Sequence, residues 1–519
     1  MKQPKWLDTA LFYEIYPQSF KDTNSDGIGD FNGIIEKLDY IKSLGCNAIW
    51  MNPCFESPFY DAGYDIADYY KIAPRYGTND DAKRLFKEVH DRGMHILLDL
   101  VPGHTSILHP WFKESQKFEK NPYTDRYVWS DNIWGGKGMT FLSGISERYG
   151  AVAVNFFAHQ PSLNYGYYEK TESWQQDMED EGPRSSREEM LNIMRFWLKM
   201  GCDGFRVDMA HSMIKGDPDQ KGTVAFWNIV RDTLDKEFDQ YALISEWGEP
   251  DKALQGGFHM DFLLHFGPSH YNDLFRCDEP FFSKRGKGEI KAFIDKYNEN
   301  LEKSGGKGMI CIPSGNHDMI RLAKYLDSDE IKLAFAFLLS MPGAPFIYYG
   351  DEIGMSYVEN LPSVEGGYER TGSRSPMQWD STPNSGFSCA YKDKMYIKMD
   401  PSEDRPTVED QLQDDSSILN EIKRLVTTRK AHSALENTAS IDFLTDTYPL
   451  CYRRKSSDES ILVIINPSDK EVKIPVEING EIIYYLGGLC QNTVSDGQKI
   501  TVTGSNITID PATAIFIRE

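Results

Sequence analysis

The sequence has no long hydrophobic run and no excess of positive charge, and each absence excludes a class of protein. No apolar stretch reaches the roughly 20 residues that a transmembrane helix requires. With 56 Lys and Arg against 79 Asp and Glu, the formal net charge is −23. This charge opposes binding to nucleic-acid phosphates and to anionic membranes. We therefore expect neither nucleic acid nor a membrane as a partner, whereas a neutral ligand meets no such penalty.

Paired cysteines and a secretion signal are also missing. The eight Cys residues are scattered without a CxxC pair, and some, such as Cys311, lie inside apolar runs. This pattern is typical of buried free thiols in a reducing compartment. No basic-plus-apolar leader opens the chain. We expect a cytoplasmic protein, a monomer or a weak homo-oligomer, although a secreted chain that had lost its signal would look the same.

The sequence does contain a repeated unit of amphipathic helix, glycine and short apolar strand. The unit occurs three times, and a glycine such as Gly201 follows each helix, where glycine accepts the left-handed conformation that ends helices. Apolar strands that alternate with helices are typical of a parallel sheet covered on both faces.

Five more apolar runs raise the number of expected strands to eight. The expected strands are residues 11–16, 48–53, 95–99, 204–208, 241–247, 258–266, 309–313 and 345–349. Eight such units predict an α/β protein built on a (β/α)₈ TIM barrel rather than on a doubly wound sheet.

Two stretches interrupt the alternation, namely residues 105 to about 185 and a long excursion after the eighth strand, at about 355 to 415. Between the third and fourth strands, an aromatic and polar stretch contains no clear helix–strand unit, which indicates a subdomain inserted over the barrel mouth. After a helix at 417–431 that closes the barrel, short alternating runs indicate an all-β domain. The expected division is a barrel, an insert and a C-terminal β-sandwich, at residues 1–104 with 186–433, at 105–185 and at 434–519.

Three carboxylates stand where expected strands run into loops. They are Asp208 in GFRVD, Glu246 in LISEW and Asp318 in SGNHD. A single acid at such a position is commonly a turn or capping residue. Three in succession, at the end of a barrel that carries active sites, predict a catalytic centre. Because carboxylates perform the chemistry at an anomeric carbon, the first hypothesis is a glycoside-processing enzyme with a small oligosaccharide as its substrate.

At these motifs the chain resembles the α-amylase family, glycoside hydrolase family 13, over essentially its full length. The resemblance is carried by DLVPGH at 99–104, GFRVD at 204–208, Glu246, NHD at 316–318 and PGAPFIYYGDE at 342–352. Two further segments are most similar to the oligo-1,6-glucosidase and α-glucosidase group, namely DTNSDGIGD at 22–30 and SRSPMQWD at 373–380.

The resemblance implies unequal roles for the three carboxylates. Asp208 matches the nucleophile, Glu246 the general acid/base and Asp318 the acid that holds the distorted sugar. Arg206 lies two residues before Asp208 on the same strand face, so its charge would lower the pKa of that carboxyl. The pKa of Glu246 would rise beside an ionised Asp208. Glu249 is the rival acid, but Glu246 lies at the end of the apolar run, where a rigid element holds it.

The resemblance also implies a set of sugar-binding residues. These are Asp65, Tyr64, His104, Arg206, His317 and Arg374. Tyr64 matches an aromatic that stacks on the sugar. For Arg374, which lies in a long loop, an ion pair at the surface is the alternative.

A loop near the start of the chain has the composition of a calcium site. Its oxygen donors alternate along the sequence, from the side chains of Asp22, Asn24, Asp26 and Asp30 and the carbonyl of Ile28. Gly33 stands where an EF-hand has its twelfth-position Glu, so the loop is not an EF-hand. The resemblance implies a structural Ca²⁺, and an Asx-rich turn without metal is the alternative.

Three departures from the family pattern leave the substrate open. Gly103 replaces an Asn that often binds a second calcium, Ser162 replaces an Asp in the insert, and Met209 follows the expected nucleophile where the group has a small or β-branched residue. Linkage preference is therefore not determined.

The leading hypothesis is a retaining α-glucosidase that hydrolyses short α-linked glucosides, of the maltose, isomalto-oligosaccharide or sucrose type, through a covalent glucosyl-enzyme. One alternative is a glucosyltransferase or isomerase, such as a trehalose synthase or a sucrose-active enzyme, in which transglycosylation replaces hydrolysis. A second is an endo-acting α-amylase. A non-catalytic family member is disfavoured because all three carboxylates are present.

Overall fold

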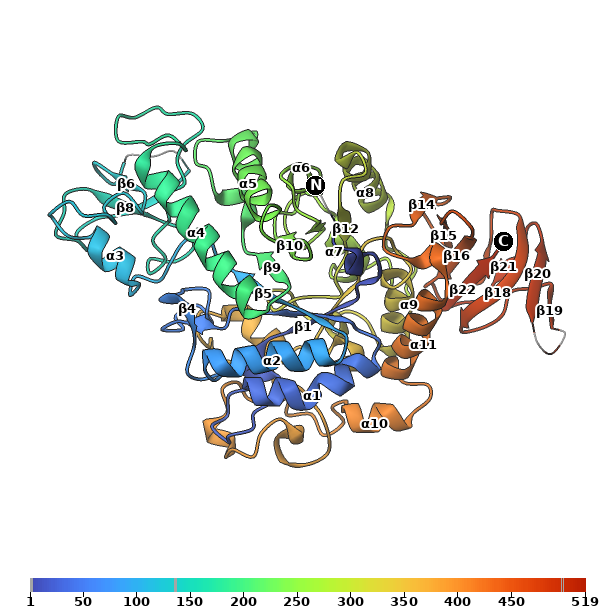
Figure 1. The fold of residues 1–519 in the computed structure, drawn as a ribbon. Helices are drawn as coiled ribbons and strands as arrows, with labels where there is room; N and C mark the ends of the chain where they lie inside the picture. The colour runs from blue at the N-terminus through green and yellow to red at the C-terminus, as the bar shows by residue number, and fades with distance from the viewer. Residues whose placement is uncertain (1–2, 135–137, 496, 498) are drawn as a thin grey trace.

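The centre of the protein is a closed barrel of eight parallel strands (Figure 1). The computed structural model describes residues 3–134, 138–495, 497 and 499–519. Within the sheet the strands follow the order β12-β11-β10-β9-β5-β2-β1-β13. A parallel bridge between Pro313 and Phe346 joins the two ends of this order and closes the barrel. The predicted (β/α)₈ TIM barrel is confirmed.

All eight strands form at the positions expected from their apolar runs. Their bounds are β1 (Phe12–Ile15), β2 (Ala48–Met51), β5 (His95–Leu100), β9 (Gly204–Val207), β10 (Ala242–Ser245), β11 (Met260–Phe262), β12 (Met309–Cys311) and β13 (Phe346–Tyr348). Nearly every strand residue is buried, because helices cover the outside while side chains fill the inside.

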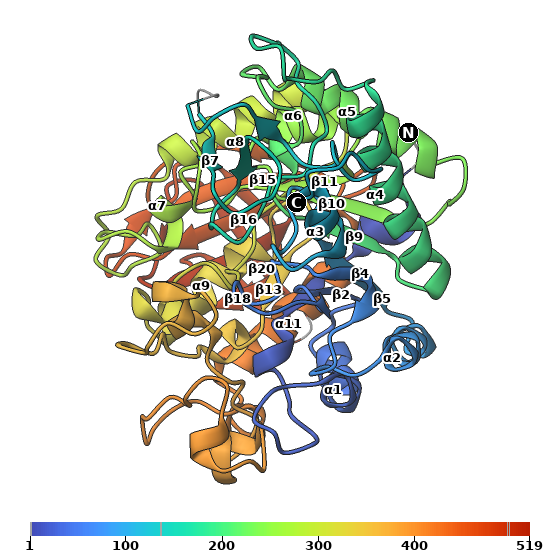
Figure 2. The same ribbon diagram turned by 90° about the vertical axis from the view of Figure 1, so that its left-hand side faces the viewer.

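Helices surround the strands, and α5, α4, α2 and α1 lie in succession along one side of the barrel in Figure 2. The principal helices are α1 (Phe31–Ser43), α2 (Asn79–Asp91), α4 (Glu181–Met200), α5 (Lys221–Leu234), α8 (Lys291–Ser304), α9 (Ser328–Leu338) and α11 (Ile418–Ala431). Capping residues determine where these helices begin and end. Thr78 and Asp81 form a capping box at α2, and Gly201 ends α4 with φ +119°. Helix α4 begins at Glu181, inside the range expected for the insert.

The insert contains its own small antiparallel sheet. It follows β5 and includes α3 (Pro110–Ser115), and its sheet has the order β6-β8-β7. These strands are β6 (Trp129–Ser130), β7 (Thr140–Leu142) and β8 (Ala151–Val154). A short antiparallel pair, β3 (Phe55–Glu56) with β4 (Asp68–Ile72), precedes it after β2. Figure 1 shows the insert at one end of the molecule and the C-terminal domain at the other.

The C-terminal domain is all-β, as predicted. Its main sheet is antiparallel and has the order β14-β15-β16-β22-β18-β20-β19. The bounds are β14 (Ser440–Phe443), β15 (Leu450–Lys455), β16 (Ser460–Asn466), β18 (Ile478–Leu486), β19 (Thr493–Ser495), β20 (Ile500–Gly504) and β22 (Thr513–Arg518). The second layer consists of two short strands, β17 (Val472–Lys473) and β21 (Thr508–Ile509). This two-stranded layer is much smaller than the seven-stranded sheet, whereas the two sheets of a typical β-sandwich are similar in size.

None of the helices in the described part of the chain combines the length and the apolar character that a membrane crossing requires.

Candidate active site

Two neighbouring barrel strands bring the expected nucleophile and the expected acid together. Asp208 directly follows β9, and Glu246 directly follows β10. Arg206 of β9 pairs in register with Ile244 of β10, so the two strand ends are level. Arg206 Nη1 lies 3.1 Å from Asp208 Oδ1, and Nη2 lies 2.6 Å from Glu246 Oε1. One guanidinium group therefore positions both carboxyls at the carboxyl end of the barrel.

A third carboxylate, Asp99 in β5, also binds this arginine. Arg206 Nη1 donates to its two oxygens at 2.8 and 3.0 Å. Trp50 Nε1 donates to Asp99 at 3.2 Å, and the guanidinium group lies 4.9 Å from the Trp50 ring centre. Because Arg206 and Asp99 are each only 1% exposed, these contacts hold the guanidinium group rigidly.

The protonation of Asp208 is decided mainly by burial. Desolvation and the neighbouring Glu246 raise the pKa of Asp208 well above its ordinary value, and Arg206 opposes them. Arg206 thus acts in the expected direction but is outweighed, because a buried second carboxyl disfavours another negative charge. Part of the effect of Glu246 is that a hydrogen bond between the two carboxyls favours a protonated Asp208, because one of two paired carboxyls must then carry a proton. The raised pKa of Asp208 therefore favours one proton on this pair of carboxyls in the free protein.

The rival acid, Glu249, lies outside the cluster. It precedes α6 (Pro250–Gln255) and forms an ion pair with Lys252 at 2.8 Å. Glu246 instead accepts a hydrogen bond from the Met209 backbone N–H at 3.3 Å. Met209 has φ +44°, a left-handed conformation that is uncommon for a residue with a side chain and is often found at functional sites.

Two arginines hold Asp318 in its ionised form. Arg370 and Arg374 donate to its Oδ1 at 2.8 and 2.9 Å, and His317 Nε2 lies 3.3 Å from Oδ2. Burial raises the pKa of Asp318, but His317 and the two arginines together outweigh it and lower that pKa far below its ordinary value. Arg374 is 1% exposed, so the alternative of a surface ion pair does not apply to it.

Tyr64 and the two expected histidines form one wall of the site. The Tyr64 ring stacks on His317 with centroids 5.3 Å apart, and the Tyr64 hydroxyl lies 2.7 Å from His317 Nε2. His104 Nε2 lies 2.9 Å from the Tyr64 carbonyl oxygen. Burial lowers the pKa of His104 to about 4, so its ring is neutral near neutral pH.

These side chains surround a pocket of about 520 Å³. Five expected residues line it, namely Tyr64, His104, Asp208, Glu246 and Asp318. Arg206, His317 and Arg374 lie behind them and bond to the lining carboxylates. A pocket with two neighbouring carboxyls, an arginine against both of them and a separately held carboxylate is suited to acid-assisted nucleophilic attack on an acetal.

Comparison with known proteins agrees with this geometry. A family profile described as "Alpha amylase, catalytic domain" matches residues 14–438. The chain belongs to the α-amylase family. Its membership makes the protein a glycosidase-family enzyme with a carbohydrate substrate.

Relatives within the α-amylase family differ in what they do. The chain is 31% identical to an oligo-1,6-glucosidase of Parageobacillus thermoglucosidasius, over 90% of this chain and 91% of that protein. It is 33% identical to a trehalose synthase/amylase of Mycobacterium tuberculosis, over 83% and 76%. The crystal structure of the trehalulose synthase MutB from Pseudomonas mesoacidophila MX-45 is similar across 99% of both chains, with a TM-score of 0.79 and 25% identity.

Asp65 is the one expected sugar-binding residue that neither lines the pocket nor bonds to one of the lining carboxylates Asp208, Glu246 and Asp318. Its carboxylate is fully buried within a loop, where it accepts hydrogen bonds from Ser57 Oγ and from the backbone N–H groups of Tyr60 and Asp61. Asp61 lines the pocket instead. This placement corrects the expectation, because two carboxylates four residues apart on an irregular loop cannot be told apart by spacing alone.

Sequence reasoning also missed most of the pocket's outer lining. The missed lining residues are Asp61, Phe156, Phe157, His265, Phe266, Tyr368 and Arg370. They belong to loops and to the insert, where no periodic pattern reports which way a side chain points. A weak signal existed in the aromatic pair Phe156–Phe157 and in Arg370, which is close to Arg374 in sequence.

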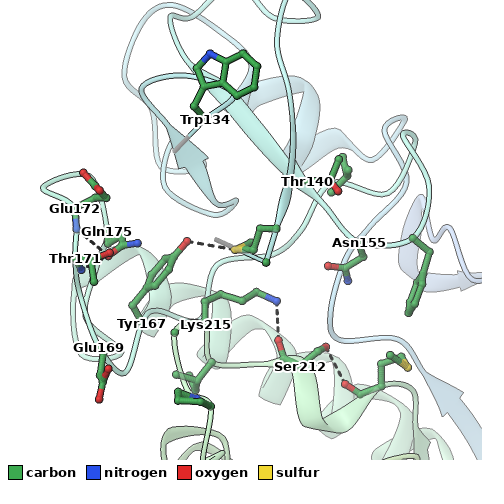
Figure 3. A pocket seen from close by; sticks show the side chains of 18 residues that line it. Trp134, Thr140, Asn155, Tyr167, Glu169, Thr171, Glu172, Gln175, Ser212 and Lys215 are labelled. Carbon is green, nitrogen blue, oxygen red and sulfur yellow. Dashed lines mark hydrogen bonds between the residues drawn. The ribbon is translucent and has the colours of Figure 1, made fainter. Parts of the chain in front are cut away.

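A larger chamber of about 1010 Å³ adjoins the pocket and shares Phe156 and Met209 with it. Figure 3 shows Trp134 at one side of this chamber, with Ser212 and Lys215 at the other. The side chain of Trp134 is 86% exposed. An exposed indole ring above polar groups is a surface on which a sugar ring can stack.

The loop expected to bind calcium is held by hydrogen bonds within itself. Asp22 Oδ1 accepts the N–H groups of Asn24 and Ser25, Asn24 accepts that of Asp26, and Asp26 accepts that of Ile28. Asp30 caps α1. These oxygen donors suit Ca²⁺ chemically. Across the described residues, however, no three His, Cys, Asp or Glu side chains are grouped as a metal site. Calcium binding therefore stays a prediction.

Proposed function

We propose that the protein is a retaining, exo-acting α-glucosidase of short α-linked glucosides, of the maltose, isomalto-oligosaccharide or sucrose type. The observation that carries this proposal is that the carboxyls of Asp208 and Glu246 both contact the guanidinium group of Arg206. Double displacement at an anomeric carbon requires such a pair, in which one carboxyl attacks the carbon and the other transfers the proton.

In the proposed reaction, Asp208 attacks the anomeric carbon and forms a covalent glucosyl ester. Glu246 gives the shared proton to the leaving oxygen, so the pair begins the step with one proton and ends it with none. Glu246 then accepts a proton from the incoming water, which cleaves the ester and restores the shared proton. Arg206 stays bonded to both carboxyls and stabilises the charge that returns to them.

Contacts across one side of the pocket support attack at chain ends. Gln160 Nε2 in the insert donates to Asp61 Oδ2 at 2.7 Å, and Asp61 Oδ1 lies 3.7 Å from Arg370 in the loop after β13. Phe157 and Tyr368 stack across the same two segments with centroids 6.2 Å apart. A glucan passing through would have to break these contacts, so we expect the substrate to enter by its end.

The test compares two substrates that differ only at the non-reducing end. One is a nitrophenyl maltoheptaoside, and the other is the same compound with that end chemically blocked. We expect release of α-glucose from the free compound and no cleavage of the blocked one. Cleavage of both would show endo action, and β-glucose as the first product would refute retention. Asp208→Asn, expected to lower kcat by on the order of 10⁴-fold or more, is the control for adventitious activity.

A second function, glucosyl transfer to a sugar, is favoured by the chamber beside the pocket. An acceptor held there by Trp134 would reach the glucosyl-enzyme in place of water. Maltose, isomaltose, sucrose and trehalose, each assayed with analysis of all products, separate the two functions. Trp134→Ala is expected to lower the ratio of transfer to hydrolysis, with Tyr149→Ala, another exposed aromatic of the insert outside the chamber, as its control. An unchanged ratio would argue against transfer through this chamber.

A further inference from the structure

A buried acid inside the barrel has no part in the steps above. Glu14 lies in β1, and its side chain is fully buried. Its Oε1 lies 2.9 Å from His317 Nδ1, whereas its Oε2 has no hydrogen-bond partner in the described part of the chain. A carboxyl in this position is available to act on His317, whose other nitrogen faces Asp318.

The surroundings of Glu14 favour its neutral form. The groups that face it are His317, Asn52 and Tyr348, and the more distant charges are Arg206, Asp99 and Asp318. Desolvation exceeds the effect of Arg206 and raises the pKa of Glu14 well above its ordinary value. Within the described ranges, the one ionisable group in short contact with Glu14 is His317, whose pKa burial lowers far below the ordinary range. The acid therefore keeps its proton, and His317 stays neutral.

Counting protons on the far side of the ring gives the tautomer of His317. Tyr64 has one hydroxyl proton, and its Oη lies 3.0 Å from Asp99 Oδ2, which accepts it. The Tyr64 oxygen and ionised Asp318 are then both acceptors beside His317 Nε2, at 2.7 and 3.3 Å. Nε2 must therefore carry the hydrogen of the neutral ring, which leaves a lone pair on Nδ1.

Among the described residues, that lone pair faces two groups that can donate to it. The hydroxyl of a protonated Glu14 is one donor, and Asn52 Nδ2, at 3.0 Å from Nδ1, is the other. If Nδ1 carried the hydrogen instead, its N–H would point at the Asn52 Nδ2–H group, and two donors would face each other without an acceptor. Both contacts on the barrel side therefore agree with the proton count on the pocket side.

We propose that Glu14 is a protonated positioning residue, which donates to His317 Nδ1 and so holds the Nε2–H of His317 toward Tyr64 and Asp318 at the sugar pocket. The inference rests on the proposed sugar-binding role of that wall, but the state of the His317 ring can be measured without any substrate.

The first test is the tautomer itself, read from the ¹⁵N chemical shifts of the protein labelled at histidine, with His317→Gln used to assign the signal. We expect an unprotonated Nδ1 and a protonated Nε2 in the wild type from pH 6 to pH 8. A signal from Nδ1–H, or from a doubly protonated ring, would overturn the proposal even if the enzyme assays failed for another reason.

The second test uses two substitutions of the same residue. Glu14→Gln keeps an N–H donor and removes the titratable proton, so we expect the same tautomer, a kcat/KM within about 3-fold of the wild type and an unchanged pH profile. Glu14→Leu removes the donor, and we expect a mixture of tautomers and a kcat lower by about 10- to 100-fold, with KM for maltose raised. Glu352→Gln, at another buried barrel acid, is the matched control and should leave the His317 signal unchanged.

Either of two results contradicts the proposal. In the first, Glu14→Gln loses activity or shifts the pH profile as strongly as Glu14→Leu. In the second, Glu14→Leu keeps both the tautomer and the kcat while only its Tm falls. If the wild type had no glycosidase activity, the proposed function would fail while the ¹⁵N result would still decide the tautomer.

Discussion

At the scale of single residues, partners rather than residue type determine what each carboxyl can do. Asp208 and Asp318 are both aspartates beside arginine. The pKa of Asp208 is raised, because burial and Glu246 outweigh Arg206. The pKa of Asp318 is lowered, because His317, Arg374 and Arg370 outweigh its burial. The same side chain thus supplies a proton-sharing partner at one position and a permanent anion at the other.

Asp61 and Asp65 provide a matched pair for testing which loop carboxylate meets the sugar. We expect Asp61→Asn to lower kcat/KM by about 10- to 100-fold with little change in Tm, since a hydrogen bond to a charged group contributes about 1.5–3 kcal/mol. Asp65→Asn should instead leave kcat/KM nearly unchanged and lower the free energy of unfolding by about 1–3 kcal/mol, because buried N–H groups lose an acceptor. Kinetics and thermal unfolding of both variants check this, and the reverse assignment would restore Asp65 as the sugar contact.

These residues show which parts of the site could be predicted from the sequence. Asp208, Glu246 and Asp318 follow apolar strands, and the strands fix where their side chains emerge. Asp61 and Arg370 lie on loops whose path depends on contacts with the insert, such as Gln160 with Asp61. A motif could indicate that loop, but only packing could decide which of its carboxylates faces the pocket.

At the scale of elements, one buried glutamate connects β1, α1 and the segment after β13. Tyr13 and Tyr40 donate to Glu352 Oε1 at 2.6 and 2.8 Å. Burial raises the pKa of Glu352 from 4.5 to about 7. The folded protein therefore holds a proton between these two pH values that the unfolded chain releases.

This pKa predicts a pH-dependent loss of stability. Since the folded state binds the extra proton, the stability contribution is complete below pH 4.5 and declines as the pH rises to about 7. Relative to the wild type, Glu352→Gln should gain up to about 3 kcal/mol between pH 4.5 and pH 8. Unfolding of both proteins across this range measures the difference, and a constant difference would show that Glu352 is ionised in the folded state.

The loop before α1 gives the prediction for metal removal. We propose that it binds one structural Ca²⁺ through the oxygens of Asp22, Asn24, Asp26, Ile28 and Asp30. A strong chelator should then lower the Tm, because a ligand of the folded state stabilises it. Asp26 is exposed, so Asp26→Ala should remove the effect of the chelator without disturbing the core. Protein free of calcium whose Tm does not rise when calcium is added would favour the Asx-turn alternative.

At the scale of the whole molecule, one face of the C-terminal sheet belongs to the hydrophobic core of the barrel, and its other face, with Leu462 and Ile515, belongs to a second cluster. Tyr452 of β15 is fully buried, and its hydroxyl lies 2.5 Å from Ser340 Oγ, just after α9. Its ring meets Phe337 of α9 edge-on at 6.3 Å. Buried residues of β15, β16 and β22 belong to the same apolar cluster as the barrel strands. The domain is therefore part of the barrel's support.

This shared core predicts one cooperative thermal transition. We expect Tyr452→Ala to cost about 3–5 kcal/mol, as large aromatic-to-alanine changes in cores do, and to lower the melting of barrel and domain together. Tyr485→Ala, at a residue of β18 that is 43% exposed, should change stability by less than about 0.5 kcal/mol. Calorimetry of both variants checks this, and two separate transitions would show that the domains unfold independently.

The sequence by itself determined the barrel, its eight strands and the three carboxylates. Buried strands appear as short apolar runs and helices as apolar residues at helical spacing, and both patterns can be seen in the sequence. Tertiary structure alone decided which loop side chains line the pocket, that Arg206 contacts both Asp208 and Glu246, and that Glu14 lies against His317. These features join residues far apart in the chain, such as positions 14 and 317, and their energies depend on burial and distance. Neither quantity exists until the barrel has closed.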